Sequence, residues 1–288
     1  MKLKRNLSAI ALVLCSISAT YFVTNSTAQQ GTPTVQAAVD NGYQVGATLY
    51  MQKAAEFRAL AYQAFNLARW QLDADLDKKN VRKLPKAEQK KPRAMMVDID
   101  ETVLDNSPAQ AYGIKNGKTF NLKDWYAWGE MRKAKAIPGA VDFLNYAASK
   151  GVKVFFVSNR DEVQKQATMD NLRNAGFKDV TVDNVLLRQV DEKGAPISTK
   201  EPRRQIILQK YRIVFFMGDN LDDHSDVFER KTVADRFAEV DKVKDWWGKR
   251  FIVLPNAMYG TWENAIYEYG RLTDVQKAEK RVNALELP

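Results

Sequence analysis

Two aspartates separated by one residue are the first residues whose spacing could do chemistry. Asp98 and Asp100 follow the apolar run Met95–Val97. Residues two apart on a strand project from the same face, so both carboxylates would leave the end of a strand together. In an open parallel sheet, ligands bind at that edge. The Asp-x-Asp pattern alone also occurs in metal-binding transferases and in surface turns, so it does not define a site by itself.

Three further polar groups follow in order at the ends of later apolar runs. They are Ser158 with Asn159, then Lys200, then the acidic run that contains Asp219 and Asp223. Each also has a simpler interpretation, as a helix cap, a solvated lysine, and a surface or calcium-binding loop. Their order, types and strand-end positions together favour one site built from several strands.

Cysteine and histidine are too scarce for several common kinds of catalysis. Cys15 is the single cysteine and His224 the single histidine. A mature chain that begins after Ala28 has no thiol nucleophile, no disulfide and no multi-histidine zinc or two-metal site. Any catalysis must therefore depend on carboxylates.

The N-terminus has the pattern of an export signal. Residues 1–28 contain three basic residues and no acids, and an apolar run extends from Leu7 to Val23. Small residues up to Ala28 suit ordinary signal peptidase, whereas the four residues ending at Cys15 imitate a lipoprotein box with an unusually bulky Leu14. We expect export across the inner membrane of a Gram-negative bacterium, to the periplasm or, with Cys15 lipidated, to the outer membrane. An uncleaved membrane anchor is the third alternative.

The composition is that of a globular protein with a basic surface. Hydrophobic residues make up 45% and charged residues 27% of 288 residues, which excludes a disordered chain or a membrane bundle. The formal charge is +9, and loss of residues 1–28 would lower it to +6. This charge could attract anionic substrates or simply be a solvated surface. No basic stripe with interleaved aromatics is present, so we do not expect nucleic-acid binding.

The order of apolar runs predicts an α/β fold with a central parallel sheet flanked by helices. Five short runs are predicted as strands: Ala94–Ile99, Val152–Val157, Val185–Leu187, Ile213–Met217 and Phe251–Leu254. Helical spacing from about residue 36 to 76 predicts one or two helices before a charged connector. We expect four segments: a signal peptide at 1–28, a leader and helical segment at 29–93, a core at 94–260 with an insertion at 106–136, and C-terminal helices at 261–288. The N-terminal region and the insertion would form a smaller, mainly helical lobe.

Several longer strings join the two aspartates in a specific combination. They are Asp98-Ile-Asp-Glu-Thr, Leu104-Asp-Asn-Ser-Pro108, Ala136-Ile-Pro-Gly-Ala140, Ser158-Asn-Arg160, Gly218-Asp-Asn-Leu-Asp-Asp223 and Pro255-Asn-Ala-Met-Tyr-Gly260. This combination resembles the haloacid dehalogenase (HAD) superfamily, and within it the bacterial class C acid phosphatases, including the lipoprotein e group of 5′-nucleotidases. The resemblance implies a Rossmann-like HAD core and Mg²⁺-dependent hydrolysis of small phosphomonoesters, nucleotides and aryl phosphates among them, through an aspartyl-phosphate.

The resemblance also assigns roles to individual residues. Asp98 corresponds to the nucleophile, and Asp100 to the acid that protonates the leaving alkoxide and later activates water. Asp98, the Asp100 carbonyl, Asp219 and Asp223 correspond to the Mg²⁺ site, for which hard oxygen ligands are suited.

The substrate side follows from the same resemblance. Phosphoryl oxygens would be bound by Ser158, the Asn159 backbone and Lys200. Phe120, Trp125 and Tyr259 occupy positions comparable to the aromatics that bracket the leaving group. Trp125 lies on a predicted helix, however, where aromatics are usually core. His224 stands where the family usually has phenylalanine; it could line the pocket, touch the substrate or be exposed, and we favour a non-catalytic role.

Other functions stay open on the same scaffold. One is an envelope protein that binds nucleotides or a planar cofactor without turnover, although both aspartates of the pair are present. Another is a phosphotransferase that prefers an alcohol to water. The sequence also leaves open a homodimer.

Overall fold

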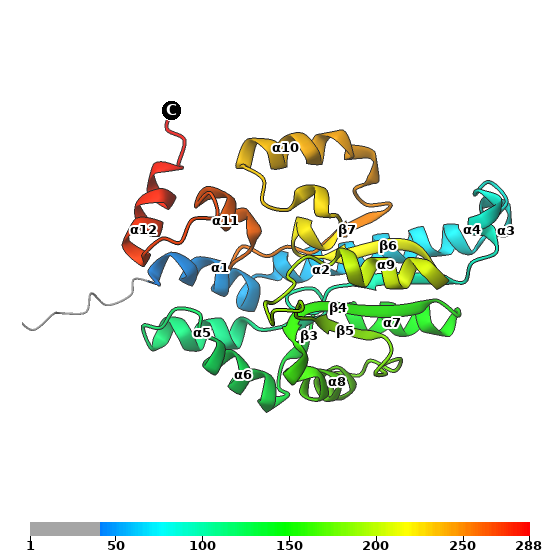
Figure 1. Ribbon diagram of the computed structural model, residues 1–288, viewed down its shortest axis with the longest axis horizontal. Coiled ribbons are helices and arrows are strands. Elements are labelled where there is room, and N and C mark those ends of the chain that lie inside the picture. The colour runs from blue at the N-terminus through cyan, green and yellow to red at the C-terminus, as the bar shows by residue number, and fades with distance from the viewer. Residues whose placement is uncertain (1–40) are drawn as a thin grey trace, which may run out of the picture. The chain divides into compact units, whose positions relative to one another are not determined.

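The five apolar runs predicted as strands pair into one parallel sheet. In the computed structural model, which describes residues 41–288, the strand order is β5-β4-β1-β6-β7 (Figure 1). The strands are β1 (Arg93–Val97), β4 (Lys153–Asp161), β5 (Val185–Arg188), β6 (Arg212–Gly218) and β7 (Phe251–Val253). From β1 the chain builds outward to β4 and β5, then returns to the other side of β1 for β6 and β7. A reversal of this kind places a crevice at the carboxyl ends of the central strands, and the predicted α/β fold is confirmed.

The alternating side chains of the strands bury both faces of the sheet. Along β1, Met95 and Val97 belong to one apolar cluster, and Ala94 and Met96 to another. The first face is covered by α2 (Ala55–Leu76), α7 (Ala140–Ser149) and α8 (Lys165–Asn174), and the second by α9 (Glu201–Lys210) and α10 (Val233–Lys242). Because both faces are covered, the strands are nearly continuous apolar runs.

The predicted helical segment before the sheet is present as two helices. α1 (Gly42–Lys53) and α2 are separated by Ala54, whose backbone is extended. Buried residues of α2 recur every three or four positions, from Phe57 to Leu72, and they lie in the same core cluster as β1. Helix α2 is therefore part of the sheet core, and the predicted domain boundaries stay predictions. The predicted signal peptide, with Cys15, lies outside the described residues.

The insertion after β1 consists of a short hairpin and two helices. β2 (Leu104–Asp105) pairs antiparallel with β3 (Lys135–Ala136). The chain between these two strands forms α5 (Ser107–Lys115) and α6 (Leu122–Met131), both labelled in Figure 1. A turn at Asn116–Gly117 ends α5, with Gly117 at a φ of 58°. Helix α5 packs against α1.

The remaining helices are short. They are α3 (Lys78–Val81), α4 (Lys86–Gln89), α11 (Thr261–Ile266) and α12 (Asp274–Asn283), the last two within the predicted C-terminal segment. Among residues 41–288, none of the helices has the length and apolar character needed to cross a bilayer.

Candidate active site

Three carboxylates and one lysine meet at the carboxyl ends of the central strands. Asp98 directly follows β1, Asp219 directly follows β6, and Asp223 ends the 3₁₀ turn η2 (Leu221–Asp223). One oxygen from each carboxylate lies within 4.8 Å of the other two. Lys200, only 4% exposed, donates from Nζ to Asp98 Oδ1 and to Asp223 Oδ1, the latter at 2.6 Å. The structure therefore brings together four of the predicted site residues from three segments.

The cluster is short of positive charge. Burial raises the pKa of Asp98, with Lys200 opposing the rise and Asp223 adding to it. Burial also raises the pKa of Asp219 well above its usual range, and the charges of Asp223 and Asp98 raise it further. Burial acts to lower the pKa of Lys200, but the charges of Asp223 and Asp98 outweigh it and the pKa is raised. Several carboxylate oxygens that share one buried cation are a donor set that fits a hard divalent cation such as Mg²⁺.

A glycine lets the acidic loop fold back on β6. A Cβ atom at Gly218 would overlap the side chain of Asp223. The Asp223 carboxylate accepts the backbone N–H of Asn220 at 3.0 Å, in a reciprocal cap of η2. A larger residue at position 218 would therefore force the Asp223 side chain or its loop to shift.

Asp100 has different surroundings from Asp98. Arg160 donates to its Oδ1 from Nη2 at 2.7 Å and from Nε at 3.0 Å. Asn106 Nδ2 donates to the same oxygen at 2.8 Å, and Ser158 Oγ donates to Oδ2 at 3.2 Å. The two carboxyl groups therefore have unlike environments: Asp98 lies in the buried acidic cluster with Lys200, and Asp100 lies among an arginine, an amide and a hydroxyl group.

The connection after β1, rather than the strand, separates the two aspartates. The predicted strand extended to Ile99, but β1 ends at Val97, so strand alternation does not position Asp98 and Asp100. Glu101, fully buried, has a φ of 59° and accepts the Asn106 N–H at 2.7 Å. This left-handed residue turns the chain sharply after Asp100, at a cost of about 1 kcal/mol.

The Ser158–Asn159 segment also differs from its prediction. The apolar run ends at Val157, but β4 continues to Asp161, and its register with β5 shifts after Val157. The prediction stopped at the first polar residue, whereas backbone pairing depends little on side-chain polarity. Ser158 is fully buried and Asn159 is exposed.

Several residues that contact the site were not predicted. Thr102 Oγ1 lies 3.4 Å from Asp98 Oδ2 and 3.3 Å from Asp219 Oδ1, and Asn256 Nδ2 donates to Asp219 Oδ2 at 2.8 Å. Thr102, Asn106, Arg160 and Asn256 all lie in the strings that carry the family resemblance, so neighbourhood within those strings was the available signal. Arg203, which donates to the Ser158 carbonyl, lies outside those strings, so they gave no signal for it.

Two of the three predicted aromatic residues lie together. The rings of Phe120 and Trp125 are 6.2 Å apart, and Phe120 is 74% exposed. The guanidinium carbon of Arg160 lies 5.3 Å from the centre of a Trp125 ring, which connects this pair to Asp100. Tyr259 instead packs against the main core cluster. Within the described part of the chain, no aromatic contact joins Tyr259 to the other two rings.

His224 is buried rather than exposed. It is 1% exposed and lies against the rings of Trp247 and Phe251. Its Nδ1 is 3.0 Å from the carbonyl oxygen of Asn220, and its Nε2 is 3.2 Å from that of Ile252. Burial lowers its pKa, so the neutral ring is favoured.

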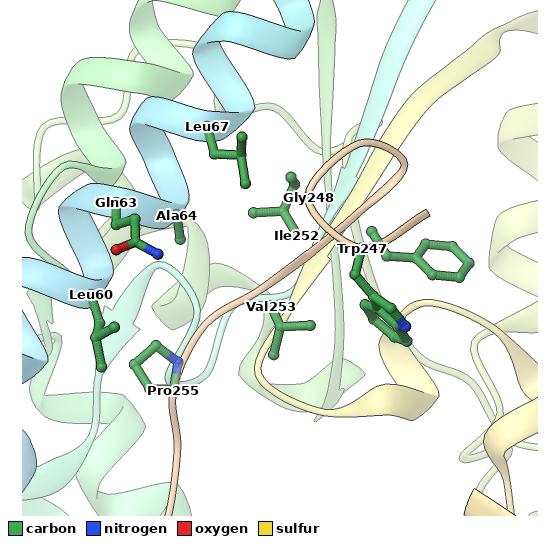
Figure 2. A pocket seen from close by; sticks show the side chains of 10 residues that line it. Leu60, Gln63, Ala64, Leu67, Trp247, Gly248, Ile252, Val253 and Pro255 are labelled. Carbon is green, nitrogen blue, oxygen red and sulfur yellow. The ribbon is translucent and has the colours of Figure 1, made fainter. Parts of the chain in front are cut away.

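A hollow of about 310 Å³ between α2 and the β7 edge is separate from this cluster (Figure 2). Its lining is mainly apolar, including Leu60, Leu67, Trp247 and Ile252. None of the clustered carboxylates lines it, so we do not assign it to the chemistry.

Comparisons with known proteins agree with this architecture. Residues 13–262 match the family model described as HAD superfamily, subfamily IIIB (acid phosphatase). The solved class C acid phosphatase from Bacillus anthracis is 40% identical, with a TM-score of 0.77, over 85% of this chain and 97% of that one. A second structure of it contains bound tungstate, with the same identity and score. The chain therefore belongs to the subfamily IIIB acid phosphatases of the HAD superfamily.

Curated relatives are more distant. Acid phosphatase 1 from Solanum lycopersicum is 31% identical over 44% of this chain and 49% of its own. A class B acid phosphatase from Aggregatibacter actinomycetemcomitans serotype C is 27% identical over 47% of this chain and 59% of its own. The chain thus spans about half the length of the curated relatives it matches.

Proposed function

We propose that this protein is a Mg²⁺-dependent phosphomonoesterase that hydrolyses small phosphate esters through an aspartyl-phosphate on Asp98. The observation that supports it best is the buried contact of Lys200 with Asp98 and Asp223, next to Asp219. Membership of an acid phosphatase family supports the same reaction. Mg²⁺ held by these carboxylates would supply the positive charge that the cluster lacks.

The reaction divides into two displacements at phosphorus. In the first, a carboxylate oxygen of Asp98 bonds to phosphorus, the ester P–O bond breaks, and Asp100 gives a proton to the departing alkoxide. In the second, Asp100 takes a proton from water, whose oxygen attacks phosphorus and releases phosphate and the Asp98 carboxylate. In the structure, Arg160 Nη2 pairs with Asp100 Oδ1 at 2.7 Å, which holds this side chain in place for both steps.

Ser158, the Asn159 backbone N–H and Lys200 are proposed to bind the phosphoryl oxygens. Donors placed where negative charge develops stabilise the transition state. The tungstate held by the Bacillus anthracis relative supports a site for a tetrahedral oxyanion.

The pair of an exposed Phe120 and a half-buried Trp125 supports a planar leaving group, such as a nucleoside or an aryl alcohol. Aromatic stacking contributes about 1–3 kcal/mol per base in other proteins and tolerates different ring systems. Tyr259 remains a weaker member of this proposal, because its ring packs against the core.

A substrate panel with and without Mg²⁺ tests the proposal. Nucleoside 5′-monophosphates, 3′-monophosphates and an aryl phosphate are incubated below neutral pH, and released phosphate is measured. We expect turnover with Mg²⁺ and none after EDTA. Tight nucleotide binding without phosphate release from any ester would instead support the non-catalytic binding protein. Addition of an alcohol acceptor separates hydrolysis from phosphotransfer.

We also propose that the protein is exported, on the basis of residues 1–28. Mass spectrometry of the mature N-terminus distinguishes cleavage after Ala28, lipidation of Cys15 and an uncleaved anchor. A chain that retains Met1 in the cytoplasm would contradict export.

A further inference from the structure

A buried arginine joins the two segments that are proposed to bind phosphate. Arg203 lies in the first turn of α9 and is 3% exposed. Its Nη1 donates to the Ser158 carbonyl at 2.6 Å. Its Nη2 donates to Asn159 Oδ1 at 2.7 Å and to the Thr199 carbonyl at 3.0 Å. One guanidinium therefore connects Ser158 and Asn159 of β4 to the residue before Lys200.

The Ser158 contact determines the direction of a neighbouring donor. The chain has no cis peptide bonds among its described residues. In a planar trans peptide, a carbonyl and the following N–H point in opposite directions. Because Arg203 binds the Ser158 carbonyl, the Asn159 N–H points away from Arg203. This N–H is the one assigned above to a phosphoryl oxygen.

The acceptors of Arg203 are uncharged, which sets it apart from most buried cations. All three are carbonyl or amide oxygens. Burial lowers its pKa to about 10, and the charges of Asp98 and Asp223 act in the opposite direction. The group is still protonated at neutral pH, so it keeps five donors in a rigid fork.

We propose that Arg203 is a positioning residue of the phosphoryl pocket, which holds the Ser158–Asn159 and Thr199–Lys200 segments together and directs the Asn159 N–H. This inference rests on the proposed function. It assigns to Arg203 no contact with the substrate and no proton transfer.

The neighbouring Arg204 offers a matched control. It lies on the same helix and is 6% exposed. Its guanidinium pairs with Glu201 and lies 5.4 Å from the centre of the Phe216 ring, so these side-chain contacts do not include Ser158, Asn159 or Thr199. Substitution of Arg204 should affect stability without affecting phosphate binding.

The test compares Arg203→Lys, Arg203→Gln and Arg204→Gln. Lysine keeps the charge but lacks the planar fork that reaches three oxygens, so it separates geometry from charge. We expect both Arg203 variants to weaken inhibition by inorganic phosphate at least about tenfold, as suits the loss of charged hydrogen bonds, and Arg204→Gln to change it less than about twofold. KM for an aryl phosphate should rise in parallel. Full rescue by lysine, or an equal loss in Arg204→Gln, overturns the inference.

A second measurement needs no variant. In wild-type protein with ¹⁵N-labelled asparagine, the Asn159 amide signal should shift when inorganic phosphate is added. An unchanged signal in a protein that is inhibited by phosphate overturns the inference alone. A wild-type protein that neither hydrolyses phosphomonoesters nor binds phosphate overturns the proposed function as well.

Discussion

The two ends of strands β1 and β6 carry ionic clusters of opposite character. The amino-end cluster is partly buried and consists of Asp75, Arg93 and Arg212. The carboxyl-end cluster consists of Asp98, Asp219, Asp223 and Lys200. At the amino ends, Arg93 and Arg212 are paired in register and share Asp75 of α2. Arg212 binds both Asp75 oxygens at 2.7 Å, and Arg93 Nε binds one of them at 2.7 Å. At the carboxyl ends, the same strands lead to Asp98 and Asp219.

The electrostatics of the two clusters differ in sign. Burial acts to raise the pKa of Asp75, but the hydrogen bonds and charges of Arg212 and Arg93 outweigh it, and the pKa is lowered. At the other end, burial and neighbouring carboxylates raise the pKa values of Asp98 and Asp219. One end stabilises its carboxylate, whereas the other holds carboxylates that repel one another. The amino-end cluster therefore contributes to folding stability, whereas the carboxyl-end cluster keeps an unfavourable repulsion that a bound ligand can relieve.

The largest effect should be on kcat, from a substitution in the carboxyl-end cluster. We expect Asp98→Asn to lower kcat at least about 10⁴-fold, because loss of a nucleophile removes the covalent route. Steady-state assays with an aryl phosphate measure it. The control is Asp226→Asn, an exposed aspartate of the same loop region as Asp219, which should keep wild-type kcat. Wild-type turnover in Asp98→Asn would refute the mechanism.

A substitution in the amino-end cluster should instead lower the free energy of unfolding. We expect Asp75→Asn to lower the free energy of unfolding by about 3 kcal/mol at pH 7, because it leaves the buried Arg212 without its partner. Urea unfolding measures the loss, and kcat per folded molecule should stay unchanged. The Asp75 contribution is present above the ordinary Asp pKa near 4 and is lost as pH falls below it. A constant difference between variant and wild type from about pH 7 to about pH 2.5 would contradict this.

Neutralising a carboxylate at the other end should have the reverse effect on stability. In protein without Mg²⁺, the raised pKa of Asp219 means that its ionised form costs stability at pH 7. We therefore expect Asp219→Asn to stabilise the metal-free protein at pH 7, because the variant has no carboxylate charge to bury at this position. The metal-free wild type should also gain stability as pH falls from about 7 towards about 5. Thermal unfolding after EDTA treatment measures both.

The same variant tests the metal. Mg²⁺ binds the folded protein, so it should raise the Tm of wild type and raise that of Asp219→Asn much less. An equal rise in both proteins would remove Asp219 from the metal site. Asp226→Asn again serves as the control, with a wild-type response to Mg²⁺.

The smallest effect should come from His224. Its two ring nitrogens face carbonyl oxygens, and a neutral ring can donate to only one of them. We expect His224→Phe to keep kcat/KM within about threefold and to change stability by less than about 1.5 kcal/mol, as near-isosteric core substitutions do. Aryl phosphate assays and urea unfolding test both values. A large loss of kcat would give His224 a role in the reaction.

Much of the carboxyl-end cluster could be predicted from the sequence. The strands were found because a sheet covered on both faces needs continuous apolar runs, and polar residues directly after such runs stand out. Asp98 and Asp219 were selected in this way, whereas Lys200, which follows Thr199 rather than an apolar run, was selected by its residue type and its order in the chain. Their meeting in one cluster follows from parallel strands, whose carboxyl ends share one edge.

The amino-end cluster could not be predicted from the sequence. Asp75 is 18 residues from Arg93 and 137 from Arg212, and charged residues at strand starts resemble ordinary surface positions. Arg203 was missed for the same reason, since its three acceptors come from two separate segments. Arg160 stood beside Ser158, but its pairing with Asp100 depends on how the connection after β1 turns.

The residue types and their order along the chain thus determined the fold class and the groups available for chemistry, because apolar periodicity and side-chain chemistry are local properties. Only the tertiary structure decided which charged groups are paired with an opposite charge and which lack such a partner. That balance depends on distances of a few ångströms between segments far apart in the chain, and on the burial that strengthens each interaction.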